Sequence, residues 1–329
     1  MRADRGYVLF LAVIVVAGLA LALLTVARVQ ADLAPQARAV AAAARASIAA
    51  EDAYARIAFL LLTETMGPRS LDLTAGRGEE RVLFLDGRFY RADDAVLVSV
   101  QDEAGLINLN ASDEGAIAGA LEHVGIGAGR ASRLAAALAD FTDEDDLVRA
   151  NGAEAVESGE EGMPRNVPLS WRWDVLNAPG WRDALDEDQR EALWNFTTAS
   201  ARRDGINVNT APLNVLRATL RDDRIAQAIV ARRAQGAVRD LQELEALTAN
   251  APRVAGAGFA VSPGDAFRVS VVVGEERRRY FFERRIEIGE AVADAPVRWR
   301  DERRAQGGAY RVEQYQFQAL PGPWRNAPL

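Results

Sequence analysis

The chain of 329 residues contains no cysteine and a single histidine. Without cysteine, neither a disulfide framework nor a thiolate metal site is available. A histidine-rich zinc site is excluded too, and a Ser-His-Asp triad would depend on His123 alone. His123 stands near the expected end of a helix, so we expect a surface or capping role for it.

An excess of positive charge is also missing. The formal net charge is -8. Because phosphate binding depends on local positive charge, this balance disfavours a nucleic-acid binder and fits a soluble exported domain.

Charged residues are absent between Gly6 and Ala27. A run of about 20 apolar helical residues spans a bilayer, whereas a signal peptide has an apolar core of only about 7–15. We therefore expect a retained membrane helix. Arg2 and Arg5 precede it, which predicts a cytoplasmic N-terminus and an exported remainder.

Good helix formers continue from Arg28 to Met66, so the membrane helix is expected to extend beyond the bilayer. Helical spacing predicts one apolar face that packs against a globular body, formed by Tyr54, Ile57, Ala58, Leu61 and Leu62. The sequence "MGPRS" then predicts the helix end.

Strand patterns lie on both sides of a helical region. Residues 81–92 predict a hairpin around Asp86-Gly87, and residues 95–102 a further strand. Short helices are expected from Ser112 to about Leu247, and a second hairpin over 266–289. Residues 310–317 predict a last strand, and the charged stretch 290–308 a mobile loop. This order indicates a helical domain inserted into one antiparallel sheet.

Two segments of the helical region resemble helix-hairpin-helix units, at 124–141 and 206–247. Such units offer backbone N–H groups to DNA phosphates. Here the charge disfavours DNA: 112–160 holds 3 Arg against 11 acidic residues, and 206–247 holds 6 Arg against 5. We expect them to serve as packing modules.

An acidic cluster at 139–162 is the strongest chemical candidate in the sequence. Its carboxylates, Asp140, Asp143, Asp145, Asp146 and Glu154, are the hard oxygen ligands that Ca²⁺ prefers. The EF-hand spacing is missing, so a solvated acidic loop is the alternative. Acid–base catalysis by paired carboxylates has no substrate pocket to support it, and we expect no enzyme activity.

Several features together resemble a known family. A short leader that ends in Arg5-Gly6, an aromatic Tyr7 and a long helix before a small sheet resemble a type IV pilin-like precursor. Five further motifs resemble, in order, those of general secretion pathway protein K, the large minor pseudopilin of type II secretion. They are "QDEAGLINLN" (101–110), "LADFTDEDD" (138–146), "NGAE" (151–154), "RNVPL" (165–169) and "INVNTAP" (206–212).

The resemblance implies that prepilin peptidase cuts between Gly6 and Tyr7 and that the new amine of Tyr7 is methylated. It also implies a place in the inner membrane through residues 7–27, with a periplasmic C-terminal domain. Most pilin-like proteins have Glu as the fifth mature residue, but Leu11 stands here. Because that carboxylate normally pairs with the amine of the subunit ahead, its loss is expected of a subunit at the filament tip.

The resemblance further implies association with the minor pseudopilins I and J and with the other pseudopilus subunits. It implies bound Ca²⁺, and the positions that match the family's acidic motif are Asp143, Asp145 and Glu154. The sequence then departs from the family pattern. The family tends to continue with Asp and a nearby Tyr, whereas Ala155 and Val156 stand here.

The fold class expected from these observations is α+β, with a pilin-like long N-terminal helix packed on an antiparallel sheet and a large inserted all-helical domain. The function expected is that of a minor pseudopilin that caps or initiates the periplasmic pseudopilus. Two alternatives stay open: a membrane-anchored helix-hairpin-helix protein that binds DNA for uptake, and a minor pilin of a related pilus. The expected segments are a leader (1–6), a membrane helix (7–27), a periplasmic helix (28–66), a pilin-like β domain (67–111 and 251–329) and the inserted helical domain (112–250).

Overall fold

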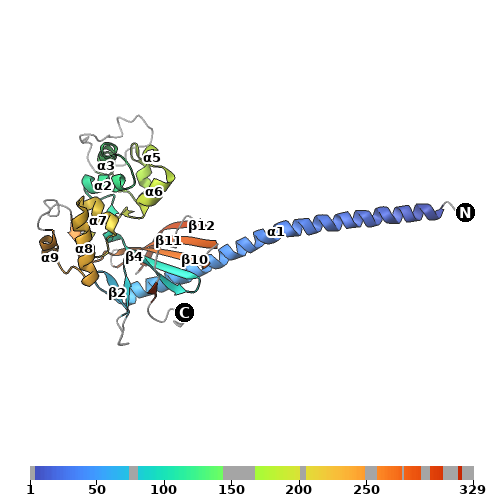
Figure 1. The fold of residues 1–329 in the computed structure, drawn as a ribbon, viewed down its shortest axis with the longest axis horizontal. Coiled ribbons are helices and arrows are strands. Elements are labelled where there is room, and N and C mark those ends of the chain that lie inside the picture. The colour runs from blue at the N-terminus through green and yellow to red at the C-terminus, as the bar shows by residue number, and fades with distance from the viewer. Residues whose placement is uncertain are drawn as a thin grey trace. The chain divides into compact units, whose positions relative to one another are not determined.

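The computed structural model describes residues 4–73, 81–143, 167–200, 205–248, 258–275, 278–289, 297–306 and 318–320. The chain divides into two compact units, Met1–Asp52 and Ala53–Leu329. One helix, α1 (Asp4–Thr63), runs through the division (Figure 1). The segment limits expected from the sequence stay predictions.

Helix α1 has the length and apolarity needed to cross a membrane. It has 60 residues, which at 1.5 Å per residue gives about 90 Å, roughly three times the thickness of bilayer hydrocarbon. The large apolar side chains between Tyr7 and Val26 are exposed. The helix ends at Thr63, so Thr65–Met66, expected to be helical, form the short strand β1 instead.

The last turns of α1 belong to the second unit and confirm most of the expected apolar face. Tyr54, Ile57 and Leu61 are buried, and the Tyr54 ring meets Trp299 edge-on with 5.4 Å between centroids. Leu62 was wrongly assigned to this face, because 46% of it is exposed.

The second unit contains a six-stranded sheet in the order β12-β11-β10-β5-β4-β13. All pairings are antiparallel except β4 with β13. The strands are β4 (Asp86–Asp93), β5 (Val96–Asp102), β10 (Ala266–Glu275), β11 (Arg278–Ile288), β12 (Val297–Gln306) and β13 (Gln318–Ala319). A smaller antiparallel sheet joins β1 to β2 (Ser70–Asp72) and β3 (Val82–Phe84).

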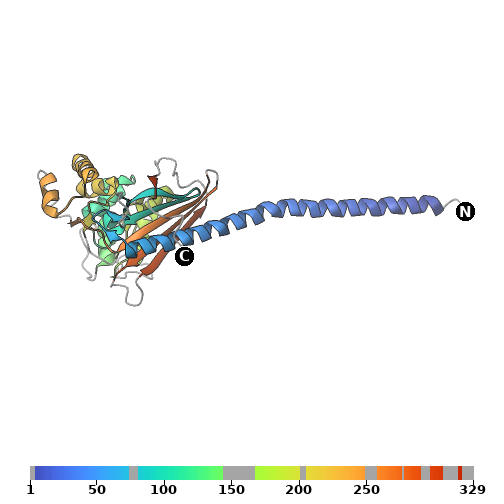
Figure 2. The ribbon, with the colours of Figure 1, turned by 90° about the horizontal axis from the view of Figure 1, so that it is seen from below.

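Strand β5 precedes the helical region and β10 follows it, yet the two pair directly, from Val96 opposite Val273 to Asp102 opposite Phe267. The sheet is therefore closed across an insertion, as the sequence predicted. Figures 1 and 2 show the sheet between the last turns of α1 and the helices of the insertion.

The two faces of the sheet differ in chemistry, because alternate side chains point to opposite sides. The face that includes Val98, Val269 and Ile286 is buried and apolar. Trp299, the register partner of Ile286, contacts Tyr54 of α1. The opposite face carries buried polar side chains, Ser99, Gln101, Arg268, Ser270, Glu283 and Arg285.

The insertion is mostly helical. Its described helices are α2 (Glu114–His123), α3 (Ala128–Thr142), α5 (Trp181–Ala184), α6 (Glu187–Trp194), α7 (Leu213–Leu220), α8 (Asp223–Gln235) and α9 (Leu241–Leu247), with the 3-10 helix η2 (Arg172–Asn177). It also contains short strands that the sequence did not predict. Strand β6 (Ile107–Asn108) pairs in parallel with β7 (Thr197–Thr198), and β8 (Ile206–Asn207) with β9 (Phe259–Ala260).

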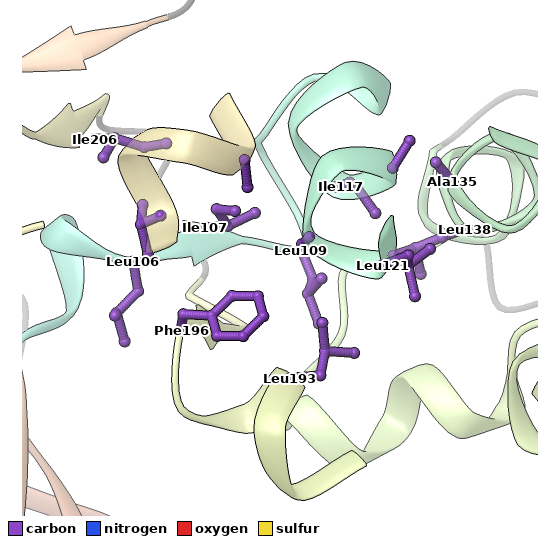
Figure 3. Close-up of a cluster of buried hydrophobic side chains, with 14 of the residues drawn as sticks. Leu106, Ile107, Leu109, Ile117, Leu121, Ala135, Leu138, Leu193, Phe196 and Ile206 are labelled. Atoms are coloured by element: carbon purple, nitrogen blue, oxygen red, sulfur yellow. The ribbon is translucent and has the colours of Figure 1, made fainter. Parts of the chain in front are cut away.

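The core of the insertion is apolar and joins all its parts. Ile107, Leu109, Leu121, Leu138 and Phe196 are buried together between α2, α3, α6 and α7 (Figure 3). Burial of this apolar surface is the main force that holds the short helices together, since isolated helices of this length are marginal in water.

The predicted hairpin at Asp86-Gly87 was wrong. Strand β3 pairs with β2 and strand β4 with β5, so the two runs belong to different sheets. Gly87 has φ +79 and lies at a bulge in β4, and a Cβ there would be 2.7 Å from Gln101 Oε1. The Asp-Gly sequence thus correctly indicated a residue with positive φ, but this residue belongs to a bulge in β4 and not to a hairpin turn.

The predicted loop at 290–308 was wrong in its second half. Residues 297–306 form β12, which pairs with β11. Among the described strands β12 is at an edge of the sheet. Charged residues suit an edge strand, which is why the composition of this strand resembled that of a loop. The predicted strand at 310–317 lies outside the described residues.

Candidate assembly site

Exposed apolar side chains continue along α1 beyond the part needed to span a membrane. Leu33, Val40 and Ile48 have 54%, 69% and 70% of their surface exposed. At about 100° per residue they fall within an arc of roughly 80°, so they form one apolar stripe. We call these three residues the α1 stripe. Single exposed apolar residues are common on proteins, but an aligned set favours contact with another helix.

The predicted processing site lies at the start of the same helix. Gly6 and Tyr7 are both within α1, and Tyr7 is exposed. Leu11 is also exposed and apolar, so no carboxylate occupies the fifth position after Gly6.

The insertion is fixed to the sheet around one buried carboxylate. Asp102, at the end of β5, is 0% exposed and accepts four hydrogen bonds. Two come from the backbone N–H groups of Ala104 and Gly264, at 3.0 and 3.1 Å, and two from Asn207 Nδ2 and Thr210 Oγ1, at 2.9 and 2.7 Å. Burial raises the pKa of Asp102, and these four donors, which lower it, offset burial only in part.

These contacts join two of the motifs that carried the resemblance. Asp102 belongs to "QDEAGLINLN", whereas Asn207 and Thr210 belong to "INVNTAP", about a hundred residues later. The motifs are therefore parts of one junction that orients the insertion on the sheet.

The structure also shows that the two motifs are equivalent to each other. The sequences Ile-Asn-Leu-Asn at 107–110 and Ile-Asn-Val-Asn at 206–209 each begin with a short parallel strand and lead into a helical pair. In each, the first Asn side chain accepts the backbone N–H of the second Asn at 3.1 Å.

The second Asn of each motif has the same role in its own half. Asn110 donates to the carbonyls of Leu169 and Ser200 and accepts the Leu169 N–H. Asn209 donates to the carbonyls of Val238 and Val261 and accepts the Val238 N–H. The insertion thus contains two similar halves. The repeated Ile-Asn pattern was a sequence signal of this, and our sequence analysis missed it.

Buried ion pairs cross from the insertion to the polar face of the sheet. Arg172 of η2 pairs with Glu283 of β11, and both side chains are less than a tenth exposed. Burial alone would raise the pKa of Glu283, but the guanidinium of Arg172, aided by Arg268, holds this pKa below its ordinary value. Arg268 also donates to the carbonyls of Trp194 and Thr197 at 2.6 and 2.7 Å.

The predicted metal ligands are only partly described. Asp143 is the C-cap of α3, whereas Asp145 and Glu154 lie outside the described residues. Within the described ranges no group of three or more carboxylate or imidazole side chains is placed to hold a metal ion. Calcium binding by Asp143, Asp145 and Glu154 stays a prediction.

The α7–α8 turn is poorly suited to DNA phosphates. The Asp222 side chain accepts the N–H groups of Arg224 and Ile225, which are the donors that a phosphate would need at this helix start. The carboxylate would also repel a phosphate there.

Comparisons with known proteins agree with this architecture. Residues 206–264, which contain the second Ile-Asn motif, α7, α8, α9 and β9, match the family model described as type II secretion system, protein K. A similar fold is found in the crystal structure of the GspK-GspI-GspJ complex from the type 2 secretion system of enterotoxigenic Escherichia coli. The TM-score is 0.57 at 16% identity, and the match covers 82% of this chain and 99% of the matched chain in that complex. A search of curated proteins gives no match.

These matches support the resemblance of this chain to the minor pseudopilin K family of type II secretion. The resemblance seen in the sequence is thereby confirmed, and so is the α+β fold class with its long N-terminal helix, antiparallel sheets and many helices. The match to the protein K family model begins at Ile206, the first residue of the motif that closes the Asp102 network.

Proposed function

We propose that this protein is a non-enzymatic minor pseudopilin that associates with other pseudopilins through α1 and caps or initiates the periplasmic pseudopilus. The observation that carries the proposal is the α1 stripe. A plain anchor needs an apolar surface only within the bilayer. Here α1 has a further exposed apolar surface beyond residues 7–27, formed by Leu33, Val40 and Ile48. A neighbouring α1 helix of the same kind would bury that surface.

The proposal includes the maturation expected from the sequence. Prepilin peptidase cuts between Gly6 and Tyr7, and α1 stays in the inner membrane through residues 7–27 with the second unit in the periplasm. Leu11 favours the tip, because a subunit with no neighbour ahead has no amine to pair with a carboxylate at that position. The bulky insertion favours the tip as well, since it would obstruct close stacking within a shaft.

The partners proposed are the minor pseudopilins I and J. The support is the solved GspK-GspI-GspJ complex, because this chain has a fold similar to that of one chain in the complex. Because the identity is 16%, the likeness itself shows the fold, and association of this chain is the proposal. The DNA-uptake alternative is disfavoured by the Asp222 carboxylate at the α7–α8 turn.

Co-purification of the full-length protein with tagged I and J subunits, in mild detergent, tests this function. Val40→Glu and Ile48→Glu should each reduce recovery of I and J several-fold, because a carboxylate would be buried at the helix contact. Ala31→Glu is the matched control, since Ala31 is exposed and lies on the other side of the helix. Equal recovery with all three variants would contradict the proposed role of the α1 stripe.

A gel-shift titration of the same preparation with duplex DNA, across a range of salt, tests the alternative. Tight, salt-sensitive binding would favour DNA uptake and count against the pseudopilin assignment.

A further inference from the structure

An arginine-rich pocket lies between β3, β4 and α8. Its cavity has a volume of about 140 Å³ and is lined by Arg69, Phe84, Asp86, Arg88, Asn209 and Arg233, among others. Asp86 is the single carboxylate among the described residues that line it, against three guanidinium groups. The chain has no lysine, so guanidinium is the only basic side-chain group available, apart from His123, to bind an anion.

Within the described ranges, only one of the three guanidinium groups has a carboxylate partner. Arg88 forms a two-point contact with Asp86, at 2.8 Å from Nε and 2.5 Å from Nη2. Arg69 donates to the carbonyl of Arg233, and Arg233 to the carbonyls of Val208 and Ala211. Among the residues that the structure describes, neither Arg69 nor Arg233 pairs with a carboxylate.

The aromatic ring of Phe84 holds two of the cations in place. The guanidinium carbons of Arg69 and Arg88 lie 4.9 and 4.0 Å from the ring centroid. Cation–π contacts of this kind fix a planar guanidinium while leaving its edge N–H groups available. Burial lowers the pKa of Arg233, Asp86 raises it, and Arg88 and Arg69 lower it again, so the cations repel one another here.

A larger groove adjoins this pocket. It has a volume of about 630 Å³, and Asp86 and Arg88 line both cavities. The groove lining also includes hydroxyl and amide side chains, Ser99, Gln101, Asn195, Asn214 and Ser270. Uncharged donors and acceptors of this kind suit the peptide groups of an extended polypeptide.

We propose that this pocket binds the carboxylate of an acidic side chain, presented by a partner polypeptide that lies in the adjoining groove. Among the described residues three guanidinium groups face one carboxylate, so the pocket has an excess of positive charge that attracts an anion. A planar carboxylate accepts two N–H groups from one guanidinium at once. Asp86 competes with the incoming carboxylate for Arg88. The site is separate from the α1 stripe, so this proposal and the proposed assembly function can fail independently.

The test measures binding of two peptide probes to the full-length protein in detergent, at constant ionic strength. The probes are acetyl-Ala-Gly-Glu-Ala-Gly-Ala-amide and the same peptide with Gln in place of Glu. The Glu peptide should bind about tenfold more tightly, the difference expected of a charge-assisted bidentate contact. Isothermal titration calorimetry gives both affinities.

Three variants make the test specific. Arg88→Gln should abolish the preference for the Glu peptide, and Asp86→Asn should strengthen it several-fold, because the competing carboxylate is removed. Arg91→Gln is the matched control on the same strand, since Arg91 is exposed and does not line the pocket. Near-ultraviolet circular dichroism verifies that each variant is folded.

Equal binding of the two peptides would overturn the proposal, and so would an equal loss in Arg91→Gln and Arg88→Gln. Inorganic sulfate is the third probe. Sulfate binding without any preference between the peptides would show a free-anion site and would overturn the assignment to a polypeptide carboxylate.

Discussion

Gly119 of α2 and Ala218 of α7 touch through their backbones, and a Cβ on Gly119 would lie 2.3 Å from the Ala218 carbonyl oxygen. Each residue stands twelve positions after the isoleucine of its own Ile-Asn motif. The two similar halves of the insertion therefore cross at equivalent points, which is the arrangement that a local two-fold relationship produces.

Replacing Gly119 with Ala should destabilise the insertion by about 1–3 kcal/mol, because α2 and α7 must separate to admit the methyl group. Gly129→Ala in α3 is the matched control, where a Cβ meets only the end of the Arg133 side chain. That variant should gain roughly 0.5–1 kcal/mol from reduced backbone entropy. Denaturant unfolding of both measures the two effects, and equal signs would contradict the close crossing.

Asp102→Asn should lower the free energy of unfolding by about 1–3 kcal/mol, since an amide NH₂ group would face donors that now share a carboxylate. The pKa of Asp102 is raised in the folded state, so the folded protein holds this proton to higher pH than the unfolded chain does. The stability that Asp102 contributes is therefore full at low pH and falls as pH rises from the unfolded pKa to the folded pKa.

The loss caused by Asp102→Asn should accordingly be larger at acid pH than at neutral pH. Urea titrations of both proteins across pH 3 to 7 give this comparison. A loss that grows with pH would instead mean that the four donors outweigh burial and depress the pKa of Asp102.

Glu283 should show the opposite pH dependence. Its pKa is depressed by Arg172 and Arg268 against the effect of burial, so its contribution is present above the unfolded pKa and is lost as pH falls through the folded pKa. Removing one partner, as in Glu283→Gln, should cost about 3–5 kcal/mol because it takes away the carboxylate that pairs with the buried guanidinium of Arg172.

A double-mutant cycle separates this ion pair from its surroundings. The cycle uses Arg172→Met, Glu283→Met and the double variant. The double variant should lose less free energy of unfolding than the two single variants lose together, by roughly 0.5–3 kcal/mol. Simple additivity would show that the two side chains do not depend on each other.

Processing at Gly6 has an unusually direct readout in this chain. Because there is no lysine, the α-amine is the only amine of the protein. We expect mass spectrometry of the membrane-extracted protein to find a chain that starts at N-methylated Tyr7. In Gly6→Val, which should not be cut, an amine-reactive label should react with the α-amine of Met1. An intact Met1 in the wild-type protein, or cleavage after Ala27, would remove the main support for pilin-like maturation.

Calcium should stabilise the protein if Asp143, Asp145 and Glu154 bind it. We expect the midpoint of thermal unfolding to rise with added Ca²⁺ in the wild type, and this rise to vanish in Asp145→Asn and Glu154→Gln. Asp113→Asn is the control, because Asp113 caps α2 outside the acidic cluster and should leave the calcium effect intact. A rise that persists in the cluster variants would place any bound calcium elsewhere.

Local patterns were sufficient for much of the fold. The long apolar run predicted α1, the hydrophobic alternation of residues 95–102 and 266–289 predicted β5, β10 and β11, and the order of elements predicted the insertion. These features depend on contacts between near neighbours, or on one dominant period, and a sequence displays both.

The errors occurred where a local signal had two structural meanings. Asp86-Gly87 required positive φ, which suits a turn and a bulge alike, and the pairing partner of each strand decided between them. The charged stretch that became β12 had the composition of a loop, and only its pairing with β11 made it a strand.

The sequence by itself determined the apolar helix, the absence of thiol and lysine chemistry and the motifs that carry the family resemblance. Tertiary structure alone decided that Asp102 meets Asn207 and Thr210, that Glu283 meets Arg172, and that three arginines and one carboxylate line the same pocket as Phe84. The physical reason is distance along the chain. Hydrogen bonds and ion pairs between residues about a hundred positions apart leave no period in a sequence, and they form only once the sheet has closed across the insertion.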